Sequence, residues 1–183
     1  ALAVLRYLWT RPSAIAASMH ERKQKQGFDA LSRGLLAIGV GDRNQAQRYA
    51  GIAQRKLPRE PLTALLRAQA AQLKGDDAAA RRAFEGMLDT EETELLGVRG
   101  LFLEAKRAGD EHAARLLAQQ AVDRNPKLAW GVNALFDLQA RAGDWDDALN
   151  TLAIARQNGH VDSSASNRRR AVSSCRMNSM ASR

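Results

Sequence analysis

Apolar residues recur along this chain at helical spacing. They keep to one side of a 3.6-residue turn over residues 62–73, and residues 144–155 repeat the pattern after an acidic start. No segment shows the alternation and turn residues of a β-hairpin. The pattern therefore predicts an all-α chain. We expect a leading helix over 13–26 and then helix pairs at 28–40/42–56, 62–74/76–88, 93–108/110–124 and 127–142/144–158.

A Gly-Asp dipeptide recurs four times at a constant interval of 34 residues. Glycine ends a helix in the left-handed conformation without a Cβ penalty, and aspartate caps the helix that follows. Each dipeptide therefore predicts the turn inside one helix pair, and 34 residues is the length of a tetratricopeptide repeat. The turns are expected at Gly41-Asp42, Gly75-Asp76, Gly109-Asp110 and Gly143-Asp144. The fold predicted is a right-handed α-solenoid of about four tetratricopeptide-like helix pairs.

Small residues keep the same register as the turns. Four residues after each aspartate comes an alanine, and seven residues further comes another alanine or a methionine. These positions are Ala46, Ala80, Ala114 and Ala148, then Ala53, Met87, Ala121 and Ala155. Small side chains let two helices approach closely where they cross, so we expect them at helix contacts. The register divides residues 27–162 into repeats 27–60, 61–94, 95–128 and 129–162.

The positive charge lies outside the repeats. The net charge is +8, yet residues 27–162 carry 18 basic and 19 acidic side chains. Residues 1–26 carry a net charge of +4, and residues 163–183, which have no helical period, carry +5. A neutral body with basic ends argues against a nucleic-acid groove and favours either contact with a membrane surface or a solvated tail. The tail 163–183 is expected to be disordered.

The first residues have two interpretations. Residues 1–9 are apolar but shorter than the roughly 20 residues that span a bilayer. Tyr7 and Trp9, followed by a basic cluster, are typical of the exit of a membrane helix into the cytoplasm. An ordinary amphipathic first helix would look similar. In the first case the segment 1–26 is membrane-proximal and the chain is a fragment.

The sequence contains no constellation typical of an enzyme or a metal site. Its histidines, His20, His112 and His160, are far apart, and none has a second ligand at helical spacing. The single cysteine, Cys175, excludes an internal disulfide. We therefore expect neither catalysis nor a bound metal. One histidine could still serve as an axial haem ligand, so a haem- or porphyrin-binding carrier stays as the alternative.

A solenoid of this kind offers a concave surface lined by the first helix of each pair. There Arg99, Lys106 and Asn133 would hold an acidic segment of another protein by charge-assisted hydrogen bonds. A generally solvated face is the alternative for these residues. On the usual tetratricopeptide geometry, the residues facing the groove are Leu65, Gln69, Arg99, Leu103, Lys106, Trp130, Asn133 and Asp137.

Several runs resemble the HemY family over about residues 5–172. The most specific are Glu92-Thr-Glu-Leu-Leu-Gly-Val-Arg-Gly-Leu-Phe and Ala142-Gly-Asp-Trp. Three earlier runs agree with them: Arg6-Tyr-Leu-Trp, Gly27-Phe-Asp-Ala-Leu-Ser-Arg-Gly-Leu-Leu-Ala-Ile-Gly, and Pro61-Leu-Thr-Ala-Leu-Leu-Arg-Ala-Gln-Ala-Ala.

The resemblance implies an inner-membrane protein of Gram-negative bacteria, in which two membrane helices precede a tetratricopeptide domain facing the cytoplasm. It implies a scaffold or regulator of late haem biosynthesis, with haem-pathway enzymes among its partners. Members of the family look as if they continue past Val172 into further helices. The resemblance therefore also implies that this chain is truncated at both ends, since the membrane helices are missing as well.

Overall fold

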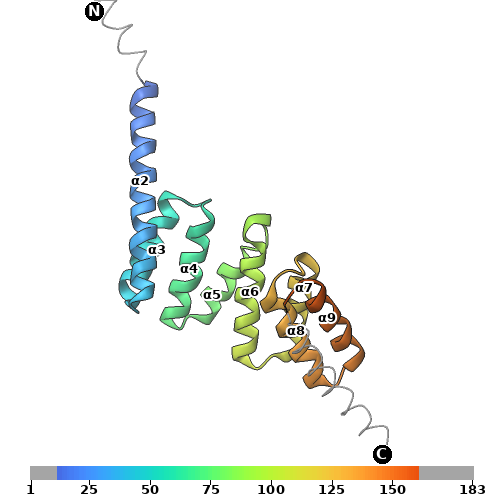
Figure 1. Cartoon of the computed structure of the whole chain (residues 1–183). Helices are drawn as coiled ribbons and strands as arrows, with labels where there is room; N and C mark the ends of the chain where they lie inside the picture. The colour runs from blue at the N-terminus through green and yellow to red at the C-terminus, as the bar shows by residue number, and fades with distance from the viewer. Residues whose placement is uncertain (1–11, 161–183) are drawn as a thin grey trace, which may run out of the picture. The chain divides into compact units, whose positions relative to one another are not determined.

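The computed structural model describes residues 12–160, and this part of the chain is helical without a strand (Figure 1). The described residues form two compact units, divided after Met87. In the first unit the helices are α2 (Pro12–Gly39), α3 (Arg43–Lys56), α4 (Pro61–Lys74) and α5 (Asp77–Glu85). In the second they are α6 (Glu91–Ala108), α7 (Glu111–Arg124), α8 (Ala129–Ala142) and α9 (Trp145–Gln157).

Within each unit, each helix packs against the next one along the chain. The eight described helices therefore form four successive pairs, and the predicted all-helical, solenoid-like repeat fold is confirmed. The boundary between the units follows Met87, inside the segment that the sequence assigned to one repeat, 61–94.

The four Gly-Asp turns share one backbone conformation. Their glycines have φ between 74° and 84°, in the left-handed region that favours glycine. At three turns the aspartate accepts a hydrogen bond from a backbone N–H in the next helix. These bonds join Asp42 to Gln45 at 3.0 Å, Asp76 to Ala79 at 2.9 Å and Asp110 to Ala113 at 2.9 Å.

Asp144 differs from the other three aspartates. The sequence predicted that it caps α9, and this prediction is wrong. Its side chain makes no capping bond to α9. The carboxylate instead accepts a hydrogen bond from Arg115 of α7, and the same guanidinium reaches Asp147 at 3.1 Å. An arginine from a neighbouring helix has therefore replaced the backbone N–H as the partner of this carboxylate.

The predicted break between a leading helix at 13–26 and a helix at 28–40 is wrong, because α2 runs unbroken from Pro12 to Gly39. Gly27 lies inside the helix at a close contact. A Cβ on Gly27 would stand 2.4 Å from Cγ of Leu57, and one on Gly34 would stand 2.6 Å from Cδ2 of Leu66. Both glycines thus allow α2 to approach its neighbours closely.

The N-terminal part of α2 extends away from the rest of its unit (Figure 1). Every residue from 18 to 26 is exposed, and burial begins only at Gly27. This stretch, which we call the α2 arm (residues 18–26), includes Arg22, Lys23 and Lys25. Among the described residues no helix combines the length and the apolar content that crossing a membrane requires. The segment 1–9 and the tail 163–183 lie outside the described residues.

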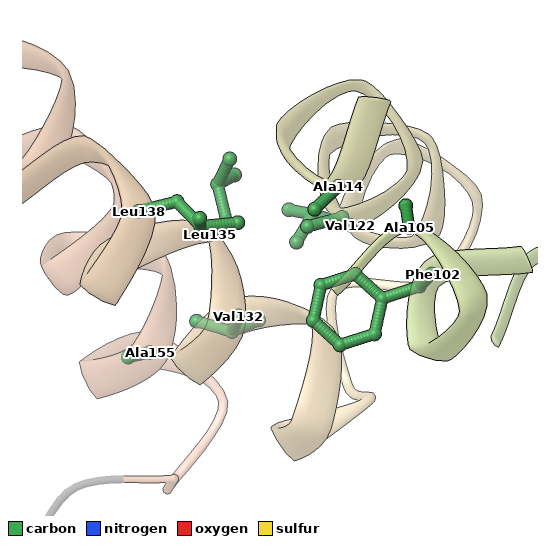
Figure 2. Close-up of a cluster of buried hydrophobic side chains, with 9 residues drawn as sticks. Phe102, Ala105, Ala114, Val122, Val132, Leu135, Leu138 and Ala155 are labelled. Carbon is green, nitrogen blue, oxygen red and sulfur yellow. The ribbon is translucent and has the colours of Figure 1, made fainter. Parts of the chain in front are cut away.

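Each unit has its own core. The eight alanine and methionine positions of the repeat register are all buried, at no more than 2 % exposed. In the first unit the core joins residues of α2, α3 and α4, such as Leu31, Ala50 and Leu66. In the second, Phe102, Val122, Val132 and Leu135 lie toward one another from α6, α7 and α8 (Figure 2). The core side chains thereby pack both α6 and α8 against α7.

Candidate functional site

Helices α6 and α8 lie side by side in the second unit. The Arg99 guanidinium lies 5.7 Å from the ring centroid of Trp130, and the rings of Phe102 and Trp130 are 5.5 Å apart. Further along both helices, Lys106 and Asp137 line one hollow. Both cross-helix pairs, Arg99 with Trp130 and Lys106 with Asp137, are 31 residues apart in the sequence. The two helices therefore run in the same direction.

The inward residues of α6 decide which side chains it leaves outside. Val98, Leu101, Phe102 and Ala105 are buried. One exposed row of α6 runs through Leu96, Arg99, Leu103 and Lys106. Leu96 is 43 % exposed and Leu103 is 45 % exposed, although both are large and apolar.

Helix α8 divides its residues in the same way. Val132 and Leu135 point into the core, and Gly131 lets the helix approach α7, since a Cβ there would stand 3.2 Å from Cβ of Ala121. Trp130 and Asn133 remain half-buried and Asp137 exposed. We call the surface made by these two rows the α6–α8 face. It consists of Leu96, Arg99, Leu103, Lys106, Trp130, Asn133 and Asp137.

A shallow hollow of about 380 Å³ lies at the C-terminal end of this face. Lys106, Asp137, Ala140 and Arg141 line it. Nε of Arg141 donates to the backbone carbonyl of Asp137 at 3.2 Å, and Nη1 lies 3.9 Å from the Glu111 carboxylate. The hollow therefore presents two cations and one carboxylate to whatever covers it.

The cations of the α6–α8 face are less neutralised than their neighbours. Arg124 and Glu94 pair at 2.7 Å, and that hydrogen-bonded contact raises the pKa of the Arg124 guanidinium. Arg107 pairs with Glu104. Among residues 12–160, neither Arg99 nor Lys106 forms an ion pair. The face therefore offers positive charge to an acidic partner.

The structure places six of the eight residues predicted for the groove on this face. The other two, Leu65 and Gln69, are half-buried on α4 and belong to the first unit. Sequence reasoning missed Leu96 and Arg141. Leu96 could have been found, because it precedes Arg99 by three residues on the row that continues to Leu103. Nothing in the sequence indicated that Arg141 lies beside Lys106, since this position depends on how α8 packs.

The histidines considered as haem ligands are separate in the structure. His20 and His112 are exposed on α2 and α7. His160 lies with Nε2 at 3.0 Å from the backbone carbonyl of Pro126. Within residues 12–160, no three His, Cys, Asp or Glu side chains gather in a way that could hold a metal ion. Cys175 lies outside the described residues.

Comparison with known protein families gives a match for the first part of the chain. Residues 1–75 match the family described as HemY protein N-terminus. The matched range includes α2, α3 and α4 and ends at Gly75, in the turn that follows α4. The α6–α8 face lies beyond it. A search of curated proteins found no match to the chain.

Proposed function

We propose that the chain is a membrane-associated scaffold for other proteins. The match of its first 75 residues to the HemY family, which is associated with haem biosynthesis and with membranes, supports this proposal. Haem-pathway enzymes are the partners proposed, and no chemistry is assigned to the chain itself. The family association supports the pathway. The helical repeats support the mode of action, because stacked helix pairs commonly present extended surfaces for binding proteins.

The observation that carries the proposal is the α6–α8 face. It combines two large exposed apolar side chains, Leu96 and Leu103, with two cations that have no ion-pair partner among the described residues. Burying the exposed part of one such leucine under a partner stabilises the complex by roughly 1 kcal/mol. A partner segment with both acidic and apolar residues would bury the leucines and pair with the cations. Trp130, held between Arg99 and Phe102, supplies a rigid aromatic group of the kind enriched in binding hot spots.

Several acidic side chains of the described residues stabilise the fold. Asp42, Asp76 and Asp110 accept backbone hydrogen bonds at helix starts. Glu94 and Asp144 bind arginines. These carboxylates thus have structural partners, and the described residues include no group of three His, Cys, Asp or Glu side chains that could hold a metal ion.

The proposed location is the bacterial inner membrane, with the repeats in the cytoplasm. The α2 arm supports contact with the membrane surface, because Arg22, Lys23 and Lys25 are all exposed on one ordered helix. Each basic residue near an anionic bilayer contributes about 1 kcal/mol of attraction at moderate ionic strength. The membrane helices expected from the family would precede this arm.

The decisive experiment is site-specific photocrosslinking of the full chain in bacterial membranes. A photoreactive residue replaces Leu103 on the face or, as the control, Leu116, an exposed leucine on α7. We expect position 103 to capture haem-pathway enzymes and position 116 not to do so. The combined change Arg99→Glu and Lys106→Glu should abolish capture at position 103. Equal capture from both positions, or no haem-pathway enzyme at position 103, would overturn the proposal.

A further inference from the structure

The exposed row on α6 has a regular spacing. From Leu96 the next residues of the row follow after three, four and three positions, at Arg99, Leu103 and Lys106. On α8, Trp130, Asn133 and Asp137 follow one another after three and four positions. This is the a/d spacing of a heptad repeat, with leucines at one position and cations at the other on α6. Two adjacent parallel helices thus present two heptad rows side by side.

This spacing distinguishes a helical occupant from an extended one. Leu96 and Leu103 are seven residues apart on one helix, which corresponds to about 10.5 Å along the axis. A partner helix repeats its own apolar residues every seven positions at the same distance, so it can cover both leucines. In an extended strand, side chains on one face are separated by about 6.7 Å or about 13.4 Å. Neither distance matches the roughly 10.5 Å between Leu96 and Leu103.

The charges determine the chemistry of the occupant. Arg99 and Lys106 are also seven residues apart, so a helix with one carboxylate in every two turns would place an acid on each of them. Asp137 lies beside Lys106 on α8. Asp137 would repel a carboxylate of the partner on the α8 side of the face. The acidic residues of the partner must therefore lie on its flank that faces α6. The order of charges therefore sets how the partner helix is oriented.

From these observations we infer that the α6–α8 face binds an acidic amphipathic helix of a partner protein. Its apolar residues cover Leu96 and Leu103, and its carboxylates pair with Arg99 and Lys106. The inference rests on the proposed function and names the kind of partner segment. The row from Leu96 to Lys106 spans eleven residues, so a segment of about three helical turns suffices. A helix so short is marginal in water and forms largely on binding.

Two synthetic peptides of identical composition test this inference on the full chain. Both are about 14 residues long and contain leucine, glutamate, alanine and glutamine. The heptad peptide has leucine at every seventh position and glutamate three positions after each leucine. The alternating peptide places the same leucines and glutamates at every second position. Binding is measured by fluorescence anisotropy at low salt, and peptide helicity by circular dichroism with an isotope-edited infrared check.

We expect the heptad peptide to bind at least about 10-fold more tightly than the alternating one and to gain helicity in the complex. Arg99→Glu with Lys106→Glu should weaken its binding at least about 10-fold, and added salt should weaken it as well. Lys127→Glu with Arg156→Glu is the matched control, since both cations are exposed in the same unit and the charge change is equal. This pair should leave binding unchanged.

Three results would overturn the inference: equal binding of the two peptides, a bound heptad peptide without helicity, or no binding of either peptide. In each of these cases the crosslinking at Leu103 still decides the proposed function separately. If position 103 captures haem-pathway enzymes while both peptides fail, the scaffold function stands and the acidic helix is excluded. If the heptad peptide binds as expected but position 103 captures none of those enzymes, the acidic helix stands and the haem-pathway scaffold is excluded.

Discussion

Residues at equivalent places in the repeat can have different physical roles. Asp110 and Asp144 both follow a left-handed glycine, 34 residues apart. Asp110 accepts the backbone N–H of Ala113 at 2.9 Å, whereas Asp144 binds Arg115 and leaves the start of α9 without a side-chain cap. The side chain of a neighbouring helix therefore decides what a repeated residue does.

This difference predicts unequal losses of stability. Asp110→Ala should lower the free energy of unfolding by about 1 kcal/mol, within a range of roughly 0.5–2 kcal/mol, because a capping bond is lost. Asp144→Ala should cost less, roughly 0–1 kcal/mol, because a partly exposed ion pair contributes little. Urea unfolding measures both. Asp110→Asn, which retains the cap, should be nearly neutral, and equal costs at the two alanine variants would contradict the assignment.

Two glycines of α2 differ in the space around them. At Gly27 an added Cβ would meet Leu57 at 2.4 Å, whereas at Gly39 nothing lies within 4 Å. Gly27→Val should therefore destabilise the protein by about 1–3 kcal/mol through overpacking. Gly39→Val is the same substitution at a position with open space around it. It should alter the free energy of unfolding by less than about 0.5 kcal/mol. Thermal unfolding of the two variants checks this, and indistinguishable midpoints would show that α2 and α3 are not in close contact at Gly27.

At the scale of the element, α2 combines a packed half with an exposed one. Residues 27–39 carry the buried positions Ala30, Leu31 and Ala37, whereas residues 18–26 are exposed throughout. A helix of 28 residues is about 42 Å long, roughly twice the length of the 14-residue α3 that packs against it. The arm is therefore rigidly joined to the repeats while its charges remain accessible.

This arrangement predicts that the arm strengthens attachment to anionic membranes. Arg22→Gln, Lys23→Gln and Lys25→Gln together should weaken binding to phosphatidylglycerol vesicles by about 1 kcal/mol per residue, or roughly 100-fold in total. Folding should be unaffected because the side chains are exposed. The matched control changes three other exposed cations of the same unit to glutamine: Arg43, Lys74 and Arg82. Vesicle co-sedimentation would reject the idea if arm and control variants bound equally.

At the scale of the whole molecule, the chain has two compact units with separate cores. The match to the HemY family lies within the first unit, and the α6–α8 face lies in the second. The family match and the proposed binding surface therefore lie in different parts of the chain. Repeat proteins in which each pair contacts only its neighbours commonly lose structure locally.

A core substitution in one unit should therefore act mainly on that unit. Leu66→Ala removes a fully buried side chain of the first unit and should cost about 2–5 kcal/mol. Hydrogen exchange should show faster exchange of the amides of α2–α5, with a much smaller change in α6–α9. Leu135→Ala, at an equally buried position of the second unit, should show the reverse. A uniform increase in both variants would mean that the two units unfold together.

By itself, the sequence determined the helical class, the four helix pairs and the position of each turn. These follow from local chemistry: glycine takes the left-handed conformation at residues 41, 75, 109 and 143, and the alanines in register with it are buried. Placing the 34-residue register on the usual tetratricopeptide geometry also gave most of the α6–α8 face.

Only the tertiary structure decided how some of these residues are used. Gly27 looks like a helix end in the sequence, yet Leu57 approaches it so closely that its lack of a side chain permits packing within a continuous helix. Asp144 looks like a cap, yet Arg115 binds it. The cross-helix contact of Arg99 with Trp130 and the hollow beside Lys106 likewise depend on the packing of α6 and α8 on α7. Such contacts join residues about 30 positions apart, and local propensity carries no information about them.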